Sequence, residues 1–530
     1  MNALSPPLPL IPDNAPFSPA QRAWLNGFLA GLYGGATAPG AATSASAALA
    51  PPEEDFPWHD PTLELDERLT LAEGRPPERR LMAAMAQLDC GQCGRLCQTY
   101  AEALARGEEG STSLCVPGGK ATARTLKKLM AEAPAAAMPA AAGAPVAPVA
   151  AVTPVELDLS TRLIRVLSAE RLTGAASSKD VRHLVIDLAD SGLTYRPGDS
   201  LGLAAANDPA LVAACLAELR ADAEAPVPCS DGLTRPAREA FATHLDIARP
   251  LDRTLDLLAM TATHPKHAQA LRRLSDGDDG AEPADADLLD LLLAFPSARP
   301  PLADLAQSLP ALRPRLYSIA SAPEAAPGQV HLCVATVRET RRTRVRGGVA
   351  SAFLADHAAA AGPVAAYVQS SHFRLPADPA VPVIMCGPGT GIAPFRAFLQ
   401  QRALAGQGGK RGRAWLFFGE RERANDFLFE RELSAWLADG TLTRLDVAFS
   451  RDQAQKVYVQ HRMAEHAADL WRWLQQGAHF YVCGDAFRMA KDVDNALRRV
   501  AITEGGLSEA QAKDWIAALA RQGRYLRDVY

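Results

Sequence analysis

After Pro154, the hydrophobic residues first show two kinds of spacing, one typical of β-strands and one typical of helices. Short apolar runs such as "RHLVIDL" (182–188), "LYSIAS" (316–321) and "QVHLCVATV" (329–337) end near turn residues and predict β-strands. Short strands at close spacing are typical of a barrel. Between residues 208 and 312, Leu and Ala recur at helical intervals. The pattern therefore predicts a barrel that is interrupted by a helical insertion.

From Val381 onward, strands alternate with helices. "VPVIMC" (381–386), "AWLFFG" (414–419) and "FYVCG" (480–484) are apolar runs, each followed by a helical pattern. This alternation predicts an open parallel sheet, in which ligands bind at the carboxyl ends of the strands.

Two low-complexity stretches divide the N-terminal region. Residues 36–55 and 133–153 are built largely from Ala, Gly, Ser and Pro, and we interpret both as linkers. The preceding piece, 1–35, contains "FSPAQRAWLNGFLAGLY" (17–33), which predicts one short amphipathic helix. Because a single helix of this length is marginal alone, we expect it to dock on another domain or subunit, or to pack on its own chain.

Composition narrows the function classes. The 530 residues are enough for about three or four domains, and the formal net charge of -5 gives no positive excess for nucleic-acid binding. The sequence contains neither a signal-peptide pattern nor a run of roughly 18 strongly apolar residues. We therefore expect a soluble, cytoplasmic protein that binds neither nucleic acid nor membrane.

Four of the nine cysteines fall within residues 90–115, and clustered thiols in a reducing compartment more often hold a metal than form disulfides. Three lie close together and one is remote, a spacing that favours a [4Fe-4S] cluster; structural zinc, the alternative, usually takes two C-x2-C pairs. The segment is also similar to the small iron–sulfur domain of corrinoid iron–sulfur proteins. The predicted metal ligands are Cys90, Cys93, Cys97 and Cys115.

A glycine-rich turn, "GPGTG" (387–391), follows a buried strand and precedes a helix. Glycines there let the backbone approach a diphosphate, and the helix N-terminus favours its charge. No Lys-Ser or Lys-Thr follows, so the turn is not a Walker loop for ATP. On this motif alone, a plain strand-to-helix turn remains an alternative.

The order and spacing of several motifs carry a specific resemblance. From residue 154 to 530 the chain resembles the flavoproteins of NADPH-dependent sulfite reductase, which belong with the NADPH-cytochrome P450 reductases and ferredoxin-NADP reductases. The motifs are "RLYSIAS", "RGGVAS", "GPGTGIAPFRAFLQ", "SRDQAQKVYVQ", "YVCGDAFRMAKDV" and "RYLRDVY".

The resemblance implies a multidomain α/β fold. An FAD-binding antiparallel β-barrel at 154–376, with a helical insertion at about 208–312, would precede a parallel-sheet NADPH-binding domain at 377–530. From the cysteine spacing, and not from this resemblance, we expect a small helical [4Fe-4S] domain at 56–132.

The resemblance also assigns site residues. For FAD these are Arg315, Leu316, Tyr317, Ser318, Gly347, Gly348, Ser351 and Tyr530. For NADPH they are Gly387, Gly389, Thr390, Gly391, Ser450, Arg451, Lys456, Tyr458, Gln460 and Asp492. The residues beside the reacting nicotinamide and flavin are Ser318, Cys483, Asp528 and Tyr530. One departure is Glu339, which replaces the tyrosine expected beside the adenine.

The relatives carry an FMN domain before the FAD half, but only about 75 residues lie between the two linkers here, too few for that fold. We therefore hypothesise that hydride passes from NADPH to FAD and that single electrons pass through the cluster to a sirohaem hemoprotein, the beta subunit of assimilatory sulfite reductase. Nitrate or nitrite reductase, or ferredoxin, are alternative acceptors. The N-terminal region could instead be a redox-sensing or assembly module.

Overall fold

The computed structural model describes residues 56–61, 63–88, 93, 95–132, 161–278, 281–283, 285–406 and 411–530. The expected docking helix, both linkers and Cys90 lie outside these residues. Residues Pro57–Tyr530 form one compact unit. No helix in the described part of the chain is both long and apolar enough to cross a membrane.

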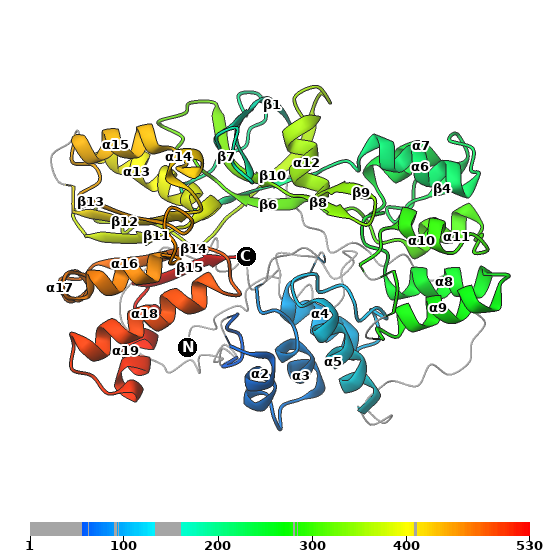
Figure 1. The fold of residues 1–530 in the computed structure, drawn as a ribbon, viewed down its shortest axis with the longest axis horizontal. Helices are drawn as coiled ribbons and strands as arrows, with labels where there is room; N and C mark the ends of the chain where they lie inside the picture. Colours follow the sequence, from blue (N-terminus) through cyan, green and yellow to red (C-terminus); the bar gives the residue numbers. More distant parts are fainter. Residues whose placement is uncertain are drawn as a thin grey trace, which may run out of the picture. The chain divides into compact units, whose positions relative to one another are not determined.

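Six antiparallel strands form the first sheet (Figure 1). Its two outermost strands, β6 and β7, meet through an antiparallel bridge between Ile319 and Leu332, so the sheet closes as the strand pattern predicts. The alternating buried positions of β2, including Leu184 and Ile186, point into the barrel core. In spatial order the strands are β6 (Arg315–Ser318), β3 (Ser200–Leu203), β10 (Val364–Gln369), β1 (Arg162–Arg171), β2 (Asp180–Asp187) and β7 (Gln329–Thr336).

Between β3 and β6 the chain forms the mostly helical segment that the sequence predicts. The segment has its own apolar core around Phe241, Leu258 and Leu292. Its first helix begins after Asp208, whose carboxylate accepts the Ala210 N–H. Its elements are α6 (Pro209–Leu219), β4 (Pro226–Pro228), β5 (Thr234–Pro236), α7 (Ala237–Thr243), α8 (Asp252–Thr261), α9 (Pro265–Ser275), α10 (Leu288–Ala294) and α11 (Leu302–Ser308).

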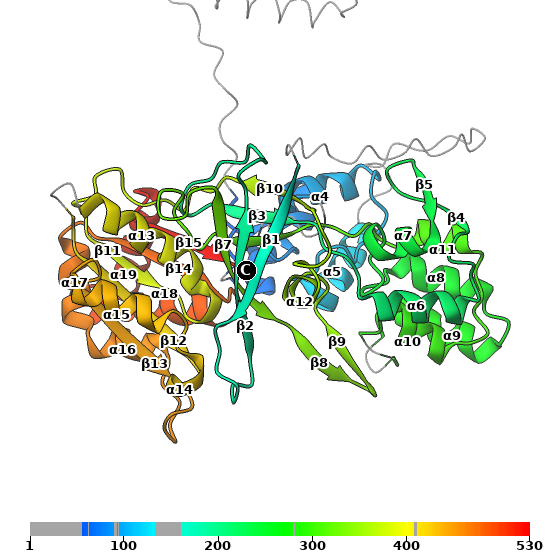
Figure 2. The same cartoon turned by 90° about the horizontal axis from the view of Figure 1, so that it is seen from above.

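A two-stranded ribbon lies between β7 and β10. Within the described part of the chain, strands β8 (Arg338–Arg341) and β9 (Arg344–Gly347) pair only with each other and lead into α12 (Val349–Asp356). Figure 2 shows this ribbon extending from the barrel.

The second sheet has five strands, all parallel, in the order β13-β12-β11-β14-β15. Helices cover both faces, with Phe395 and Leu433 on one side and Met463 and Leu497 on the other. This two-sided burial explains the continuous apolar runs of the sequence. The strands are β11 (Val383–Cys386), β12 (Ala414–Glu420), β13 (Arg444–Phe449), β14 (His479–Gly484) and β15 (Tyr525–Val529). The helices are η1 (Gly389–Ile392), α13 (Ala393–Gly406), α14 (Arg423–Asp426), α15 (Glu430–Ala438), α16 (Val459–Glu465), α17 (Ala467–Gln475), α18 (Met489–Thr503) and α19 (Glu509–Arg521).

Residues 56–132 are helical where they are described. The helices are α2 (Leu65–Leu71), α3 (Pro77–Ala83), α4 (Cys97–Ala105) and α5 (Gly119–Glu132). Trp58, Met82, Tyr100 and Leu126 are buried among them. An ion pair joins residues 56–132 to the parallel-sheet domain: the Asp60 carboxylate lies 3.2 Å from the Arg527 guanidinium.

Candidate functional site

A cavity of about 1990 Å³ is lined by most of the residues expected to bind FAD. Arg315, Leu316 and Tyr317 contribute from β6. Gly347, Gly348, Ser351 and Tyr530 line the same cavity, although they lie far from β6 in sequence. The fold therefore brings these sequence-predicted positions to one wall.

The turn at Gly347 and Gly348 fits a phosphate group. A Cβ on Gly348 would lie 2.7 Å from the Ser351 Oγ, and one on Gly347 would lie 2.7 Å from the Ala352 Cβ. Gly348 is also the N-cap of α12. Only glycine fits this turn without displacing its neighbours, and backbone N–H groups at a helix start favour an anion.

Arg315 is fixed at the cavity wall by two contacts. Its guanidinium lies 3.7 Å from the Asp246 carboxylate and donates to the Arg313 carbonyl at 2.8 Å. Burial raises the pKa of Asp246, although the charge of Arg315 opposes this shift. Asp246 belongs to the helical insertion, 69 positions from Arg315, and no motif in the sequence pointed to it.

Ser318, Cys483 and Asp528 meet where the barrel joins the parallel sheet. The Ser318 hydroxyl donates to Asp528 Oδ2 at 2.6 Å, and the Cys483 thiol donates to the same oxygen at 3.6 Å. Cys483 and Asp528 are cross-strand partners on β14 and β15. Burial raises the pKa of both the Asp528 carboxyl and the Cys483 thiol. Three of the four residues predicted beside the reacting nicotinamide and flavin thus form one hydrogen-bonded set.

Tyr530 lies beside this set. Its backbone N–H donates to the Gly484 carbonyl at 3.1 Å, and its hydroxyl is 3.1 Å from the Thr390 Oγ1. The residue is 48% exposed. A ring held by one side-chain hydrogen bond can be displaced at low cost.

The glycine-rich turn meets the same set from the sheet side. A Cβ on Gly391 would lie 2.1 Å from the Cys483 carbonyl oxygen, and one on Gly387 would lie 2.5 Å from the Gly391 carbonyl oxygen. Gly389 has a φ of +60°. These contacts place the start of η1 directly against the end of β14, an arrangement that fits a dinucleotide diphosphate.

The residues expected to recognise the adenosine end lie beyond β13. Ser450 and Arg451 follow the strand directly, and their backbone N–H groups donate to the Glu420 and Arg421 carbonyls. The side chains of Arg451, Lys456 and Tyr458 are exposed. Gln460 Nε2 donates to Asp492 Oδ2 at 3.0 Å, which brings these two predicted positions together.

Three of the four predicted metal ligands share a small pocket. Cys93, Cys97 and Cys115 line it together with apolar groups such as Leu114. Cys93 and Cys115 also line the large cavity that contains the flavin motif. Among the described residues, no group of three His, Cys, Asp or Glu side chains is arranged to hold a metal ion, and Cys90 is not among them. The cluster therefore remains a prediction.

Glu339, which replaces the expected aromatic residue, lies on β8. It accepts a hydrogen bond from the Arg341 Nε at 2.8 Å. Its carboxylate is thus occupied by a neighbour on the same strand.

Comparison with known proteins identifies two domains. The FAD binding domain family matches residues 159–353, and the oxidoreductase NAD-binding domain family matches residues 385–495.

Three relatives named "Sulfite reductase [NADPH] flavoprotein alpha-component" are similar to the chain. The Yersinia pestis protein is 40% identical over 408 residues, covering 75% of this chain and 63% of its own length. The Bacillus subtilis (strain 168) protein is 41% identical over 367 residues, covering 69% and 60%, and the Serratia proteamaculans (strain 568) protein is 42% identical over 373 residues, covering 68% and 59%. The chain thus spans about three fifths of the length of these relatives.

Proposed function

The chain carries an FAD-binding domain followed by an oxidoreductase NAD-binding domain, and from this pairing we propose that it is an NADPH-dependent electron-transfer flavoprotein of assimilatory sulfite reduction. The chain is about 40% identical to sulfite reductase flavoproteins, which supports sulfite reductase as the electron acceptor. The proposed partner is the hemoprotein beta subunit that the name alpha-component implies.

The observation that carries the proposal is the junction of Ser318, Cys483 and Asp528 beside the cavity. When bound, FAD accepts a hydride from NADPH and releases electrons singly. Asp528 fixes the orientation of the Ser318 hydroxyl through the 2.6 Å hydrogen bond. Tyr530, which lines the cavity, would shield this point from water, and its displacement would admit a nicotinamide ring.

Preference for NADPH rests on the residues beyond β13. Arg451 and Lys456 are exposed cations in the loop after the strand, and Tyr458 adds an aromatic face. A guanidinium can bind a phosphate through two parallel hydrogen bonds. These side chains would therefore hold the 2′-phosphate that distinguishes NADPH from NADH.

For the one-electron carrier, we propose a [4Fe-4S] cluster held by Cys90, Cys93, Cys97 and Cys115. Thiolates are the usual ligands of such a cluster, which accepts and donates single electrons. Two observations support the proposal: three of the thiols line one pocket, and two of these also line the cavity of the flavin motif.

Two measurements test the proposal. Anaerobically purified protein should contain FAD together with iron and acid-labile sulfide, whereas a zinc site would give zinc and no sulfide. With NADPH and a sirohaem subunit, the protein should support sulfite reduction. Failure with every sirohaem subunit, alongside reduction of a nitrite reductase or a ferredoxin, would refute the proposed acceptor.

The variant Cys93→Ala tests the role of the thiol pocket. We expect it to abolish electron delivery to the hemoprotein while NADPH-dependent reduction of ferricyanide by the flavin survives. Cys215→Ala is the matched control, because Cys215 is a buried thiol in the helical insertion and lines neither the small pocket nor the large cavity. Persistence of both activities in Cys93→Ala would show that the N-terminal region is structural or regulatory.

A further inference from the structure

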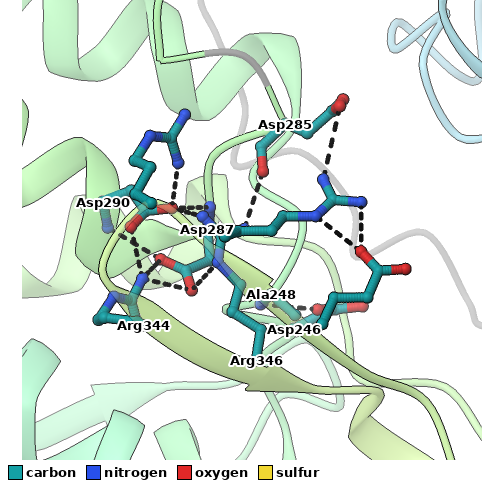
Figure 3. Close-up of polar contacts among 10 residues, drawn as sticks. Asp246, Ala248, Asp285, Asp287, Asp290, Arg344 and Arg346 are labelled. Atoms are coloured by element: carbon teal, nitrogen blue, oxygen red, sulfur yellow. Dashed lines mark hydrogen bonds and ion pairs between the residues drawn. The ribbon is translucent and has the colours of Figure 1, made fainter. Parts of the chain in front are cut away.

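Three aspartates form one acidic edge of the helical insertion and face arginines that lead to the flavin motif. They are Asp246, Asp287 and Asp290, which we call the acidic edge (Figure 3). We propose that the acidic edge positions the two elements expected to hold the FAD diphosphate, Arg315 and the turn at Gly347 and Gly348. This inference rests on the proposed binding of FAD.

Asp287 and Asp290 are buried carboxylates at the start of α10. Asp287 is 2% exposed and Asp290 is 7% exposed. Asp287 is the N-cap, and each carboxylate accepts the backbone N–H of the other residue. Capping satisfies only part of their hydrogen-bonding capacity, and buried anions also require cations.

The cations come from the ribbon formed by β8 and β9. Arg344 donates to both Asp287 oxygens at 2.7 and 2.8 Å and to Asp290 Oδ1 at 2.5 Å (Figure 3). The Arg346 Nε lies 3.4 Å from Asp287 Oδ2, and its Nη2 contacts Asp290. Arg342, in the turn between the strands, donates to Asp290 at 2.8 Å. Three guanidinium groups thus converge on two carboxylates immediately before Gly347.

Asp246 contacts Arg315, the other element expected to hold the diphosphate. Its carboxylate lies 3.7 Å from the Arg315 guanidinium and accepts the Ala248 N–H at 3.0 Å. The Leu288 N–H donates to the Ile247 carbonyl at 2.9 Å, which ties this segment to the start of α10. The start of β6 and the end of β9 are therefore anchored to the same edge.

The ribbon needs such an anchor. A two-stranded ribbon is marginally stable by itself, and among the residues that the structure describes β9 has no strand partner other than β8. The buried ion pairs fix the ribbon, and the ribbon in turn fixes the turn at Gly347 and Gly348. Preorganisation of this kind lowers the cost of ligand binding.

The test variant is Arg344→Lys, which keeps the charge, but its ammonium ends one bond short of the Nη2 position that makes all three contacts with Asp287 and Asp290. We expect the FAD dissociation constant to rise about tenfold or more, because a misplaced binding group loses a large part of its effect. FAD affinity is measured by titrating the apoprotein and following the fluorescence of the flavin. Binding of adenosine 2′,5′-bisphosphate to the NAD-binding domain should stay unchanged, which reports an intact fold.

Arg235→Lys is the matched control. Arg235 forms a two-bond ion pair with the more exposed Asp231, at 2.8 and 2.6 Å, elsewhere in the insertion. This variant should retain the FAD affinity of the parent. Should Arg344→Lys give no folded protein, the isosteric Asp246→Asn tests the Arg315 contact, with the same expected loss of FAD affinity.

Unchanged FAD affinity in a folded Arg344→Lys protein, or an equal loss in Arg235→Lys, would overturn the inference. If the parent protein itself binds no FAD, the proposed function fails instead, so the two failures are distinguishable.

Discussion

Replacing Gly391 by Ala should both destabilise the parallel-sheet part and slow hydride transfer. The added Cβ would lie 2.1 Å from the Cys483 carbonyl oxygen, 2.8 Å from its carbonyl carbon and 3.3 Å from the Gly484 nitrogen. All three atoms belong to the backbone at the end of β14, which pairs with β11 and β15 on its two sides. No flexible side chain can move aside, so η1 must shift by roughly 1 Å to restore ordinary contact distances.

Overpacking of this kind costs about 1–3 kcal/mol of unfolding free energy. For a domain of this size, each kcal/mol corresponds to a fall of about 2–4 °C in Tm. The shift also displaces the glycine turn from Cys483, the cross-strand partner of Asp528, and a displacement of about 1 Å can slow a positioned reaction about 100-fold.

The assay combines thermal unfolding with stopped-flow measurement of flavin reduction by NADPH. Gly110→Ala is the control, because a Cβ on Gly110 would meet no atom within 4 Å and its backbone does not adopt a positive φ. A Gly391→Ala protein with the Tm and the flavin reduction rate of the control would refute the reasoning.

Two further predictions concern coenzyme preference and pH. Arg451→Ala should raise the KM for NADPH about tenfold or more and leave that for NADH nearly unchanged, because only NADPH has the phosphate partner; equal weakening of both in steady-state assays would show that Arg451 is misassigned. Burial, together with the charge of Arg396, lowers the pKa of His183 and His331 from 6.5 to about 4. The folded state therefore favours the neutral rings, and the stability they contribute above pH 6.5 should be lost as the pH falls toward 4. Urea unfolding of His183→Gln at pH 7 and pH 5 checks this, since the variant should lose less stability than the parent over that interval; an equal loss would contradict it.

Periodicity was sufficient to predict the main architecture. The barrel strands, the helical segment between β3 and β6 and the parallel sheet each have a distinct spacing of apolar residues, because each is buried on a different number of faces. Motif order placed Ser450 and Arg451 after a strand end, where the structure also has them. Apolar spacing and motif order are properties of neighbouring residues in the sequence, so they can be recognised without a structure.

Contacts between distant segments could not be read in this way. The hydrogen bond between Ser318 and Asp528 joins residues 210 positions apart, and only the family resemblance suggested it. The acidic edge gave no signal, because Asp287 in sequence is an ordinary helix N-cap. Its pairing with Arg344 depends on how the insertion packs beside the ribbon, which apolar spacing does not encode.

The order of strands in the parallel sheet has an evolutionary consequence. The loop that would select the coenzyme follows β13 at one edge, whereas Asp528 lies on β15 at the opposite edge. If these roles hold, mutations that exchange one nicotinamide coenzyme for another would fall at the edge of the sheet opposite Asp528. A lineage that faced a changed supply of reductant could retune its electron source and leave the machinery of reduction untouched.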